Sequence, residues 1–378
     1  MSQDMKSGEA PSEAALSLFS GLLRDAVALA GTGLASPADI DTAMRLGAGH
    51  PVGPLTLLRH LDPTVRAAAG LPEPPEAVVE PDRSEQETAA EVWEHPVGVA
   101  GTGTMASGIA EALVRADVPA IVLGRTRASA ERLHDAVATS LGKAVARGRL
   151  TDDLHQRALA HLHLTTDPGD LADCGHVIEA VAEDLAVKQE LLRLLDDALP
   201  VDTVLATNTS SLTVAEIRAG LPAWRTVIAL HFFNPAKAMK LVEVTGPDED
   251  VVNAACAWVR RIGKVPVRCG DERGFVVNRL LIPYLNDAVR ALDAGAFTAI
   301  ETDALMCEAF GHPMGPFELI DLIGTDVTAA AQSMLHQASG DARLKPADGL
   351  LSLVAEGRFG RKSGAGFHDH SSPTRSTT

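Results

Sequence analysis

The stretch that decides the fold is Val97-Gly98-Val99-Ala100-Gly101-Thr102-Gly103-Thr104-Met105-Ala106-Ser107-Gly108-Ile109-Ala110. The apolar run at its start predicts a short strand, and the amphipathic run that continues from its end predicts a helix. Gly101 permits a tight turn between them, Gly103 lets the backbone approach a pyrophosphate, and Ala106 leaves room for the helix to pack on the strand. A diphosphate would then lie on the N–H groups of the first helical turn, at Thr104 and Met105. The stretch therefore predicts a dinucleotide-binding turn.

The end of the next strand bears on which dinucleotide binds. Residues 120–123 form a second apolar run, which is followed by Arg125, Thr126 and Arg127. In NAD-binding domains an acidic residue usually stands here and binds the ribose hydroxyls. Arginine forms forked hydrogen bonds to phosphate oxygens, so this loop favours NADP over NAD. The alternative is that both arginines are solvated on a surface loop.

Size and composition narrow the classes of protein. The chain has 378 residues and is 46% apolar, enough for two or three domains with real cores. Its net charge of −17 argues against nucleic acid and anionic membranes as partners. The four cysteines have no CxxC spacing, so we expect neither a metal site nor a disulfide framework. With a polar N-terminal start, the cytoplasm is the expected location.

Strand and helix patterns divide the chain into domains. Predicted strands lie at 97–100, 120–123, 176–181, 203–206, 227–230 and 241–245, with a helical excursion from 128 to 164. Short apolar strands between helices predict a doubly wound, mostly parallel α/β sheet over residues 96–273. From residue 274 to 378 the pattern is all helical, with helices expected at 275–293, 300–310 and 317–335.

The N-terminal segment repeats part of this helical domain. Residues 23–59 match residues 285–321 at a constant offset of 262, and Gly49-His50-Pro51-Val52-Gly53-Pro54 corresponds to Gly311-His312-Pro313-Met314-Gly315-Pro316. We therefore expect a duplicated helical unit over residues 1–70, followed by an acidic, Pro-rich linker over 71–95. Two helices cannot bury an apolar stripe alone, so the copy should pack on its C-terminal relative.

A histidine and a glutamate suggest the chemistry. His231 follows the apolar run 227–230, which predicts a buried parallel strand, and Glu243 lies twelve residues further on in a second apolar run. Imidazole, with an ordinary pKa of about 6.5, can accept and return a proton near neutrality. A carboxylate on its second nitrogen fixes the tautomer and stabilises the imidazolium. Alone, such a histidine is more often structural, but beside a dinucleotide site it indicates a general base.

Together these motifs resemble the L-3-hydroxyacyl-CoA dehydrogenase family, which includes bacterial 3-hydroxybutyryl-CoA dehydrogenases. The resemblance extends from about residue 97 to 367 and rests on motifs at 101–110, 208–212, 231–235, 239–244, 274–279 and 360–364. It implies a Rossmann domain and an all-α C-terminal domain that dimerises. In multifunctional members a second helical copy replaces the dimer partner, so this chain is expected to be a homodimer or a pseudo-dimeric monomer.

The resemblance also implies roles for individual residues. His231 would be the general base, Glu243 would orient it, and Ser210 and Asn278 would bind the substrate oxygen. The resemblance further places Glu183, Lys188 and Asn208 at the cofactor, and Ser140, Arg147 and Asn234 at the substrate. Lys237, which lies beside the site, is also expected to bind the substrate. The Asn-Thr-Ser-Ser run at 208–211 could instead cap a helix.

Lys237 departs from the family pattern, because acyl-CoA members commonly have proline there. An added cation favours an acidic acyl group or a carrier-protein thioester. The implied function is an NAD(P)-dependent oxidoreductase that interconverts a 3-hydroxyacyl thioester, of CoA or acyl carrier protein, and its 3-oxoacyl form. The alternatives are a dehydrogenase of a free hydroxy or sugar acid, similar to gulonate dehydrogenases, and a non-catalytic nucleotide-binding module.

Overall fold

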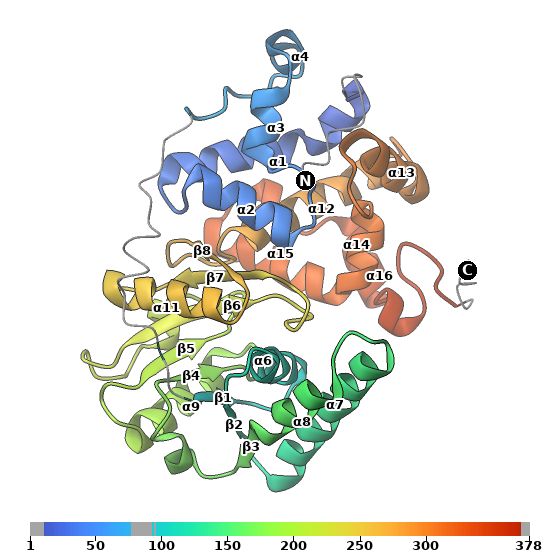
Figure 1. The fold of residues 1–378 in the computed structure, drawn as a ribbon. Helices are drawn as coiled ribbons and strands as arrows, with labels where there is room; N and C mark the ends of the chain where they lie inside the picture. The colour runs from blue at the N-terminus through green and yellow to red at the C-terminus, as the bar shows by residue number, and fades with distance from the viewer. Residues whose placement is uncertain (1–10, 77–92, 94–95, 372–378) are drawn as a thin grey trace. The chain divides into compact units, whose positions relative to one another are not determined.

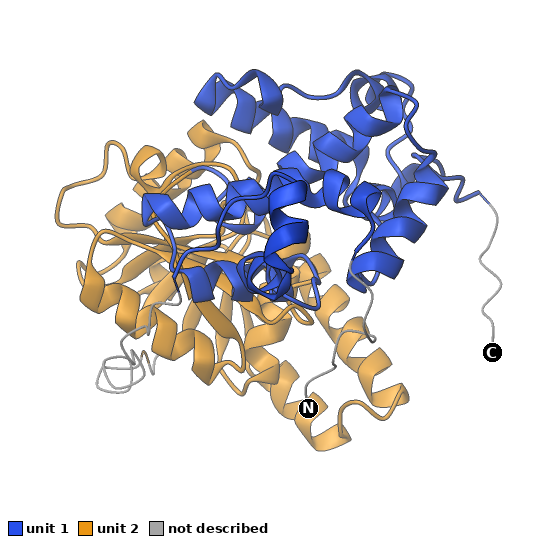
Figure 2. Ribbon diagram, turned by 90° about the horizontal axis from the view of Figure 1, so that it is seen from above, with its two compact units in different colours: residues 1–78, 273–378 blue, residues 79–272 orange. Residues whose placement is uncertain are grey.

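The computed structural model describes residues 11–76, 93 and 96–371. The chain divides into two compact units, shown in two colours in Figure 2: residues 1–78 with 273–378, and residues 79–272. The predicted N-terminal and C-terminal helical segments therefore belong to one helical unit, and the sheet forms the other. Most of the predicted linker over 71–95 lies outside the described residues, as do the ends of the chain.

The sheet unit contains an eight-stranded sheet in the order β3-β2-β1-β4-β5-β6-β7-β8 (Figure 1). The strands from β3 to β6 pair in parallel, β7 runs antiparallel to β6, and β8 is parallel to β7. This confirms the mostly parallel, Rossmann-type sheet. The strands are β1 (Val97–Ala100), β2 (Ala120–Leu123), β3 (Leu162–Thr165), β4 (His176–Glu179), β5 (Val204–Thr207), β6 (Val227–Phe232), β7 (Leu241–Thr245) and β8 (Val265–Arg268).

Two strands at the edges of the sheet are absent from the sequence prediction. The expected helical excursion over 128–164 consists of α7 (Arg127–Ala146) and α8 (Asp152–Ala160), and its last residues belong to β3. Neither β3 nor β8 has the continuous apolar run of a central strand, because one side of an edge strand faces solvent. β6 extends to Phe232, so His231 lies within the strand and not after it.

Helices pack on the sheet through apolar faces. The helices of this unit, besides α7 and α8, are α6 (Thr104–Arg115), α9 (Leu185–Ala198), α10 (Val214–Ile217) and α11 (Glu249–Arg261). Ile109 and Leu113 of α6 and Trp258 of α11 share one buried core with Val97 and Val99 of β1. The glycine-rich turn is thereby fixed between a buried strand and a buried helix face.

The helical unit is built around one central helix, α12 (Val277–Asp293), against which α1 (Glu13–Thr32) packs. Its other helices are α2 (Pro37–Gly47), α3 (Pro54–His60), α4 (Pro63–Ala68), α13 (Ala299–Phe310), α14 (Pro316–Ile323), α15 (Thr325–Ser339) and α16 (Asp348–Ala355). The single helix expected at 317–335 is two helices, because Gly324 adopts a φ of +111° that ends α14.

The two matching sequence segments make matching hydrogen bonds. Asp41 accepts hydrogen bonds from the backbone N–H groups of Leu55, at 2.8 Å, and Thr56, at 2.9 Å. At the same offset of 262, Asp303 accepts from the N–H groups of residues 317, at 2.8 Å, and 318, at 3.2 Å. In each segment an aspartate on one helix thus holds the start of the next helix.

α1 is the one described helix that is long and apolar enough, by length and composition, to cross a membrane. Its apolar residues Phe19, Leu22 and Leu23 are buried in the helical unit. The length and hydropathy of α1 are also typical of a helix in a protein core. The packing of α1 gives it that role.

Candidate active site

His231 and Glu243 face each other across two antiparallel strands. They are directly opposed in the β6–β7 register, which places their side chains on the same face of the sheet. His231 Nδ1 lies 2.7 Å from Glu243 Oε2, and the two residues are 5% and 1% exposed. The predicted pair therefore forms, buried from solvent.

The carboxylate partner decides which nitrogen of His231 can act as a base. An ionised carboxylate only accepts hydrogen bonds, so Nδ1 must carry the proton when it bonds to Glu243. In the neutral ring this leaves Nε2 with the lone pair. The ring also contacts Phe233, with centroids 4.4 Å apart, which restricts its rotation. The arrangement gives a base with one defined tautomer and one defined orientation.

The backbone beside His231 is held by Asn208. The side-chain oxygen of Asn208 accepts a hydrogen bond of 2.8 Å from the backbone N–H of Phe232. The backbone N–H of Asn208 donates to the backbone carbonyl of Glu179 at 2.9 Å. Asn208 therefore links the ends of β4, β5 and β6. The loop that follows contains a cis peptide between Asn234 and Pro235, and Asn234 is exposed there.

Glu183 organises the segment that contains Ser210. Its Oε1 accepts hydrogen bonds from the N–H groups of Ser210, at 2.8 Å, and Ser211, at 2.9 Å, and from the hydroxyls of Thr209 and Ser211. Burial raises the pKa of Glu183, but the charge of Lys188 and these hydrogen bonds outweigh burial and lower the pKa to about 2. An ionised carboxylate thus fixes the turn on which Ser210 lies.

Thr213, and neither Ser210 nor Ser211, caps the helix that follows this turn. The Thr213 hydroxyl accepts from the N–H of Glu216, and the Glu216 carboxylate accepts from the N–H of Thr213. The reading of the run at 208–211 as the cap of α10 is therefore wrong, and the two serines are engaged with Glu183 instead.

Lys188 is buried between two carboxylates. Its Nζ donates to both oxygens of Glu179, at 2.8 and 3.0 Å, and lies 3.2 Å from Glu183. Lys188 is 1% exposed and Glu179 is fully buried, and the hydroxyl of Thr207 also donates to Glu179 at 2.6 Å. Each buried charge thus has a partner, as burial requires. The ion pair with Lys188 therefore also helps to hold Glu183 in place.

The glycine-rich turn has the geometry that its sequence predicts. Gly101 has a φ of +131°, and a Cβ there would lie 2.5 Å from the carbonyl oxygen of Ala180, so only glycine fits. At Gly103 a Cβ would meet no atom within 4 Å among the described residues, so packing does not demand glycine there. Gly103 is the N-cap of α6 and Thr104 and Met105 begin the helix, which has no side-chain cap.

The loop after β2 has local roles as well as a predicted cofactor role. Thr126 caps α7, since its hydroxyl accepts from the N–H of Ser129 at 3.2 Å. Arg127 forms an exposed ion pair with Glu131 at 2.9 Å. Arg125 is exposed at the end of β2. Of the three residues predicted to bind the cofactor here, it is the one for which the described residues show no contact with α7.

Two predicted substrate residues meet at a carboxylate that the sequence analysis missed. Lys237 donates to the hydroxyl of Ser140 and lies 3.2 Å from Glu111, and Ser140 donates to Glu111 at 3.0 Å. Arg115 also pairs with Glu111, at 3.1 Å. Glu111 is 3% exposed on α6.

Two further predicted residues belong to other elements of the fold. Arg147 is exposed at the C-cap of α7, and Asn278 lies in the first turn of α12, in the helical unit. Their substrate roles stay predictions. Among residues 11–76, 93 and 96–371, no group of three or more His, Cys, Asp or Glu side chains could hold a metal ion.

Glu179 and Glu111 were not predicted as site residues, although the sequence contains a signal for both. Glu179 stands within the apolar stretch 177–182, and Glu111 stands within the apolar stretch 109–114. A charge amid apolar residues requires a partner, and this reasoning, applied to Glu243, applies equally to both.

Comparison with known families agrees with this geometry. The family model described as 3-hydroxyacyl-CoA dehydrogenase, NAD binding domain, matches residues 96–272. The model described as 3-hydroxyacyl-CoA dehydrogenase, C-terminal domain, matches residues 17–94 and 274–370. The second model thus matches both helical segments.

Individual proteins give the same result. The chain is 39% identical over 282 residues to a 3-hydroxybutyryl-CoA dehydrogenase of Mycobacterium tuberculosis, covering 72% of this chain and 98% of the relative. It is similar to the crystal structure of FadB2 from M. tuberculosis, with a TM-score of 0.71 and 38% identity over 74% of this chain and 99% of that chain. The (S)-3-hydroxybutyryl-CoA dehydrogenase of Ralstonia eutropha gives a TM-score of 0.69 and 33% identity over 73% and 99%. With its glycine-rich turn, its buried His231–Glu243 pair and these matches over most of its length, the chain belongs to the 3-hydroxyacyl-CoA dehydrogenase family.

Proposed function

We propose that this protein interconverts a 3-hydroxyacyl thioester and its 3-oxoacyl form, with His231 as the general base. The observation that supports this most directly is the buried 2.7 Å contact between His231 Nδ1 and Glu243, in a chain whose relatives are named 3-hydroxybutyryl-CoA dehydrogenases. Nε2 takes the proton of the 3-hydroxyl group, and the imidazolium that forms is stabilised by the ionised Glu243. In the reverse direction, the imidazolium protonates the developing alkoxide.

The residues of the glycine-rich turn fit a dinucleotide. Gly101 is demanded by the fold itself, whereas a Cβ at Gly103 would meet no described atom, so a ligand that approaches the backbone there accounts for the second glycine. The first-turn N–H groups of Thr104 and Met105 would bind its diphosphate. When bound in this turn, a nicotinamide dinucleotide would supply the acceptor for the hydride that leaves C3 of the substrate. Arg125 supports NADP as the preferred form.

Polar groups around the base would bind the reacting oxygen. Ser210 is presented by a turn that Glu183 holds with several hydrogen bonds, so its position costs little to organise during the reaction. Asn208 keeps the end of β6 in place through the Phe232 N–H. By resemblance, Asn278 of the helical unit would add a second donor to the oxygen, and Glu183 and Lys188 would position the nicotinamide ribose.

The substrate's acyl group or carrier is expected to be anionic. Lys237 presents an ammonium group beside Ser140, a residue that the resemblance places at the CoA moiety. We extend the proposal to thioesters of CoA or of acyl carrier protein. The packing of α1 along α12 within one chain supports a pseudo-dimeric monomer. None of Cys174, Cys256, Cys269 and Cys307 forms a disulfide, which is typical of proteins in a reducing compartment and supports a cytoplasmic location.

Substitution of the base tests this proposal. His231→Gln should lower kcat with acetoacetyl-CoA by about a hundredfold or more, while NADPH and NADH still bind when followed by fluorescence. His163→Gln, on an exposed position of β3, is the matched control and should keep full activity. Acetoacetyl-CoA, acetoacetyl carrier protein and free acetoacetate should be compared. Full turnover by His231→Gln, or reduction of the free acid alone, would contradict the proposal.

A further inference from the structure

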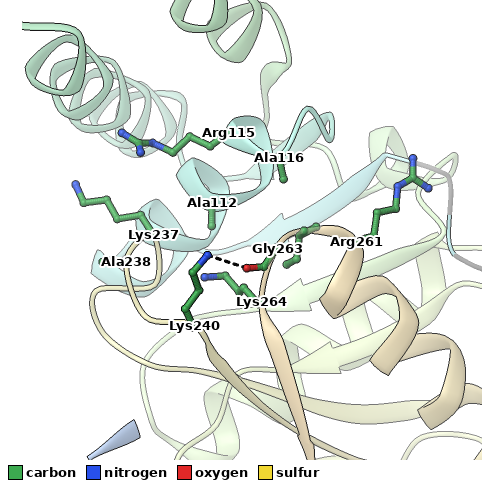
Figure 3. Close-up of a pocket in the computed structure, with 10 residues that line it drawn as sticks. Ala112, Arg115, Ala116, Lys237, Ala238, Lys240, Arg261, Gly263 and Lys264 are labelled. Atoms are coloured by element: carbon green, nitrogen blue, oxygen red, sulfur yellow. Dashed lines mark hydrogen bonds between the residues drawn. The ribbon is translucent and has the colours of Figure 1, made fainter. Parts of the chain in front are cut away.

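A cavity of about 360 Å³ in the sheet unit is lined by five cationic side chains (Figure 3). They come from three places in the fold: α6, the loop between β6 and β7, and the end of α11 with the turn that follows it. The five are Arg115, Lys237, Lys240, Arg261 and Lys264. Like charges repel one another, so their convergence in a chain with a net charge of −17 requires an explanation. We call this cavity the cationic pocket.

The lysines at the centre of the cationic pocket are anchored by carbonyl groups. Lys240 donates to the carbonyl of Gly263 at 3.0 Å. Lys264 donates to the carbonyls of Ala236, at 2.5 Å, and Met239, at 2.7 Å. A carbonyl oxygen is a neutral acceptor, so it fixes the position of an ammonium group and leaves its positive charge in place.

Lys264 is held in an environment that disfavours its charge. It is 7% exposed, and burial, followed by the repulsion of Lys240, lowers its pKa to about 8. A bound anion would offset both effects, because it supplies the opposite charge in a region where solvent screening is weak.

One wall of the cationic pocket adjoins a predicted substrate residue. Lys237 donates to Ser140, and the carboxylate of Glu111 pairs with both Lys237, at 3.2 Å, and Arg115, at 3.1 Å. Figure 3 shows Lys237 and Arg115 extending toward the same side of the cavity. The pocket therefore continues from the position at which the family resemblance places the CoA moiety.

We propose that the cationic pocket binds a phosphate group of the handle that carries the acyl chain. This inference rests on the proposed function, and adds a site to it. The volume of the cavity suits a small ligand group, and lysine and arginine together are the side chains that bind phosphate oxygens most strongly. The phosphate belongs either to CoA or to the phosphopantetheine arm of a carrier protein.

A double variant, Arg115→Gln with Arg261→Gln, tests the proposal by kinetics. It should raise KM for a phosphate-bearing thioester about tenfold, with little change in KM for acetoacetyl-N-acetylcysteamine, which contains no phosphate. Arg260→Gln, the neighbouring exposed arginine of α11 that does not line the cavity, is the matched control for net charge. A rise confined to acetoacetyl-CoA identifies CoA as the source, and a rise confined to the carrier-protein thioester identifies the arm. Equal changes for all substrates, or none, would overturn the proposal.

Direct binding separates failure of this inference from failure of the proposed reaction. Adenosine 3′,5′-bisphosphate and 4′-phosphopantetheine are titrated into the full-length protein in a calorimeter. At least one should bind, and about tenfold more weakly to the double variant than to Arg260→Gln. If the protein turns over no thioester but this difference persists, the reaction is wrong and the phosphate site stands. If neither compound binds, or both variants bind alike, the phosphate site is wrong.

Discussion

Glu243→Gln tests the reasoning about the base most sharply, because it removes one charge and preserves the shape of the side chain. Glutamine can still accept a hydrogen bond from His231 Nδ1, which now lies 2.7 Å from the carboxylate. What disappears is the attraction between the carboxylate and the imidazolium that forms during the reaction. Glu243 is 1% exposed, so water cannot replace that attraction.

The geometry gives the size of the effect. Opposite charges about 4 Å apart interact by about 4 kcal/mol at an effective dielectric constant of about 20. The retained neutral hydrogen bond, worth about 1 kcal/mol, recovers part of this. A net loss of about 2–4 kcal/mol in the transition state corresponds to a fall in kcat of about 30- to 1,000-fold. Because Glu243 acts through His231, KM should change little.

The assay follows oxidation of the reduced nicotinamide with acetoacetyl-CoA, over a range of substrate concentrations that separates kcat from KM. Glu249→Gln is the control, since Glu249 also pairs with a cation, Arg268, but is exposed in the same unit. The melting temperature of each variant shows whether the fold is intact. A folded Glu243→Gln enzyme with kcat within threefold of wild type would refute the assignment of Glu243 as the positioning residue.

Three further predictions concern the cofactor and the helical unit. Arg125→Asp should move the NADP-to-NAD ratio of kcat/KM toward NAD by about tenfold or more; an unchanged ratio would remove Arg125 from the cofactor site. His50 and His312 stack with centroids 4.3 Å apart, and burial lowers both pKa values, that of His312 to about 4. Because unfolding lets these rings take up protons below their ordinary pKa of about 6.5, stability should fall as pH decreases from 6.5 toward 4, with about 2 kcal/mol lost at pH 5 through His312. Denaturant titration at pH 7 and pH 5 measures this, and a His312→Gln variant with the same pH dependence as wild type would contradict it. Gly315→Ala places a Cβ 2.2 Å from the Cα of Asp303 and should lower the free energy of unfolding by about 2–3 kcal/mol; Gly31→Ala, which meets no described atom within 4 Å, is the control.

Local patterns in the sequence predicted most of the sheet and both members of the His231–Glu243 pair. The central strands are continuous apolar runs, and the glycine-rich turn combines a strand, a turn and a helix within fourteen residues. Such patterns are visible because each depends on neighbouring residues. β3 and β8 were not predicted, since at the edges of the sheet the apolar run is shortened or interrupted.

Partners that are distant in sequence were decided by the tertiary structure. Which residues oppose each other depends on the order of strands and on register: the β6–β7 register places Glu243 on His231, and the neighbouring positions of β4 and β5 place Thr207 beside Glu179. The sequence alone determined that a dinucleotide turn, a histidine and a carboxylate are present. Only the folded chain determined that Lys188 is enclosed by Glu179 and Glu183, because buried charges choose partners by proximity in space, and no periodicity along the chain encodes that proximity.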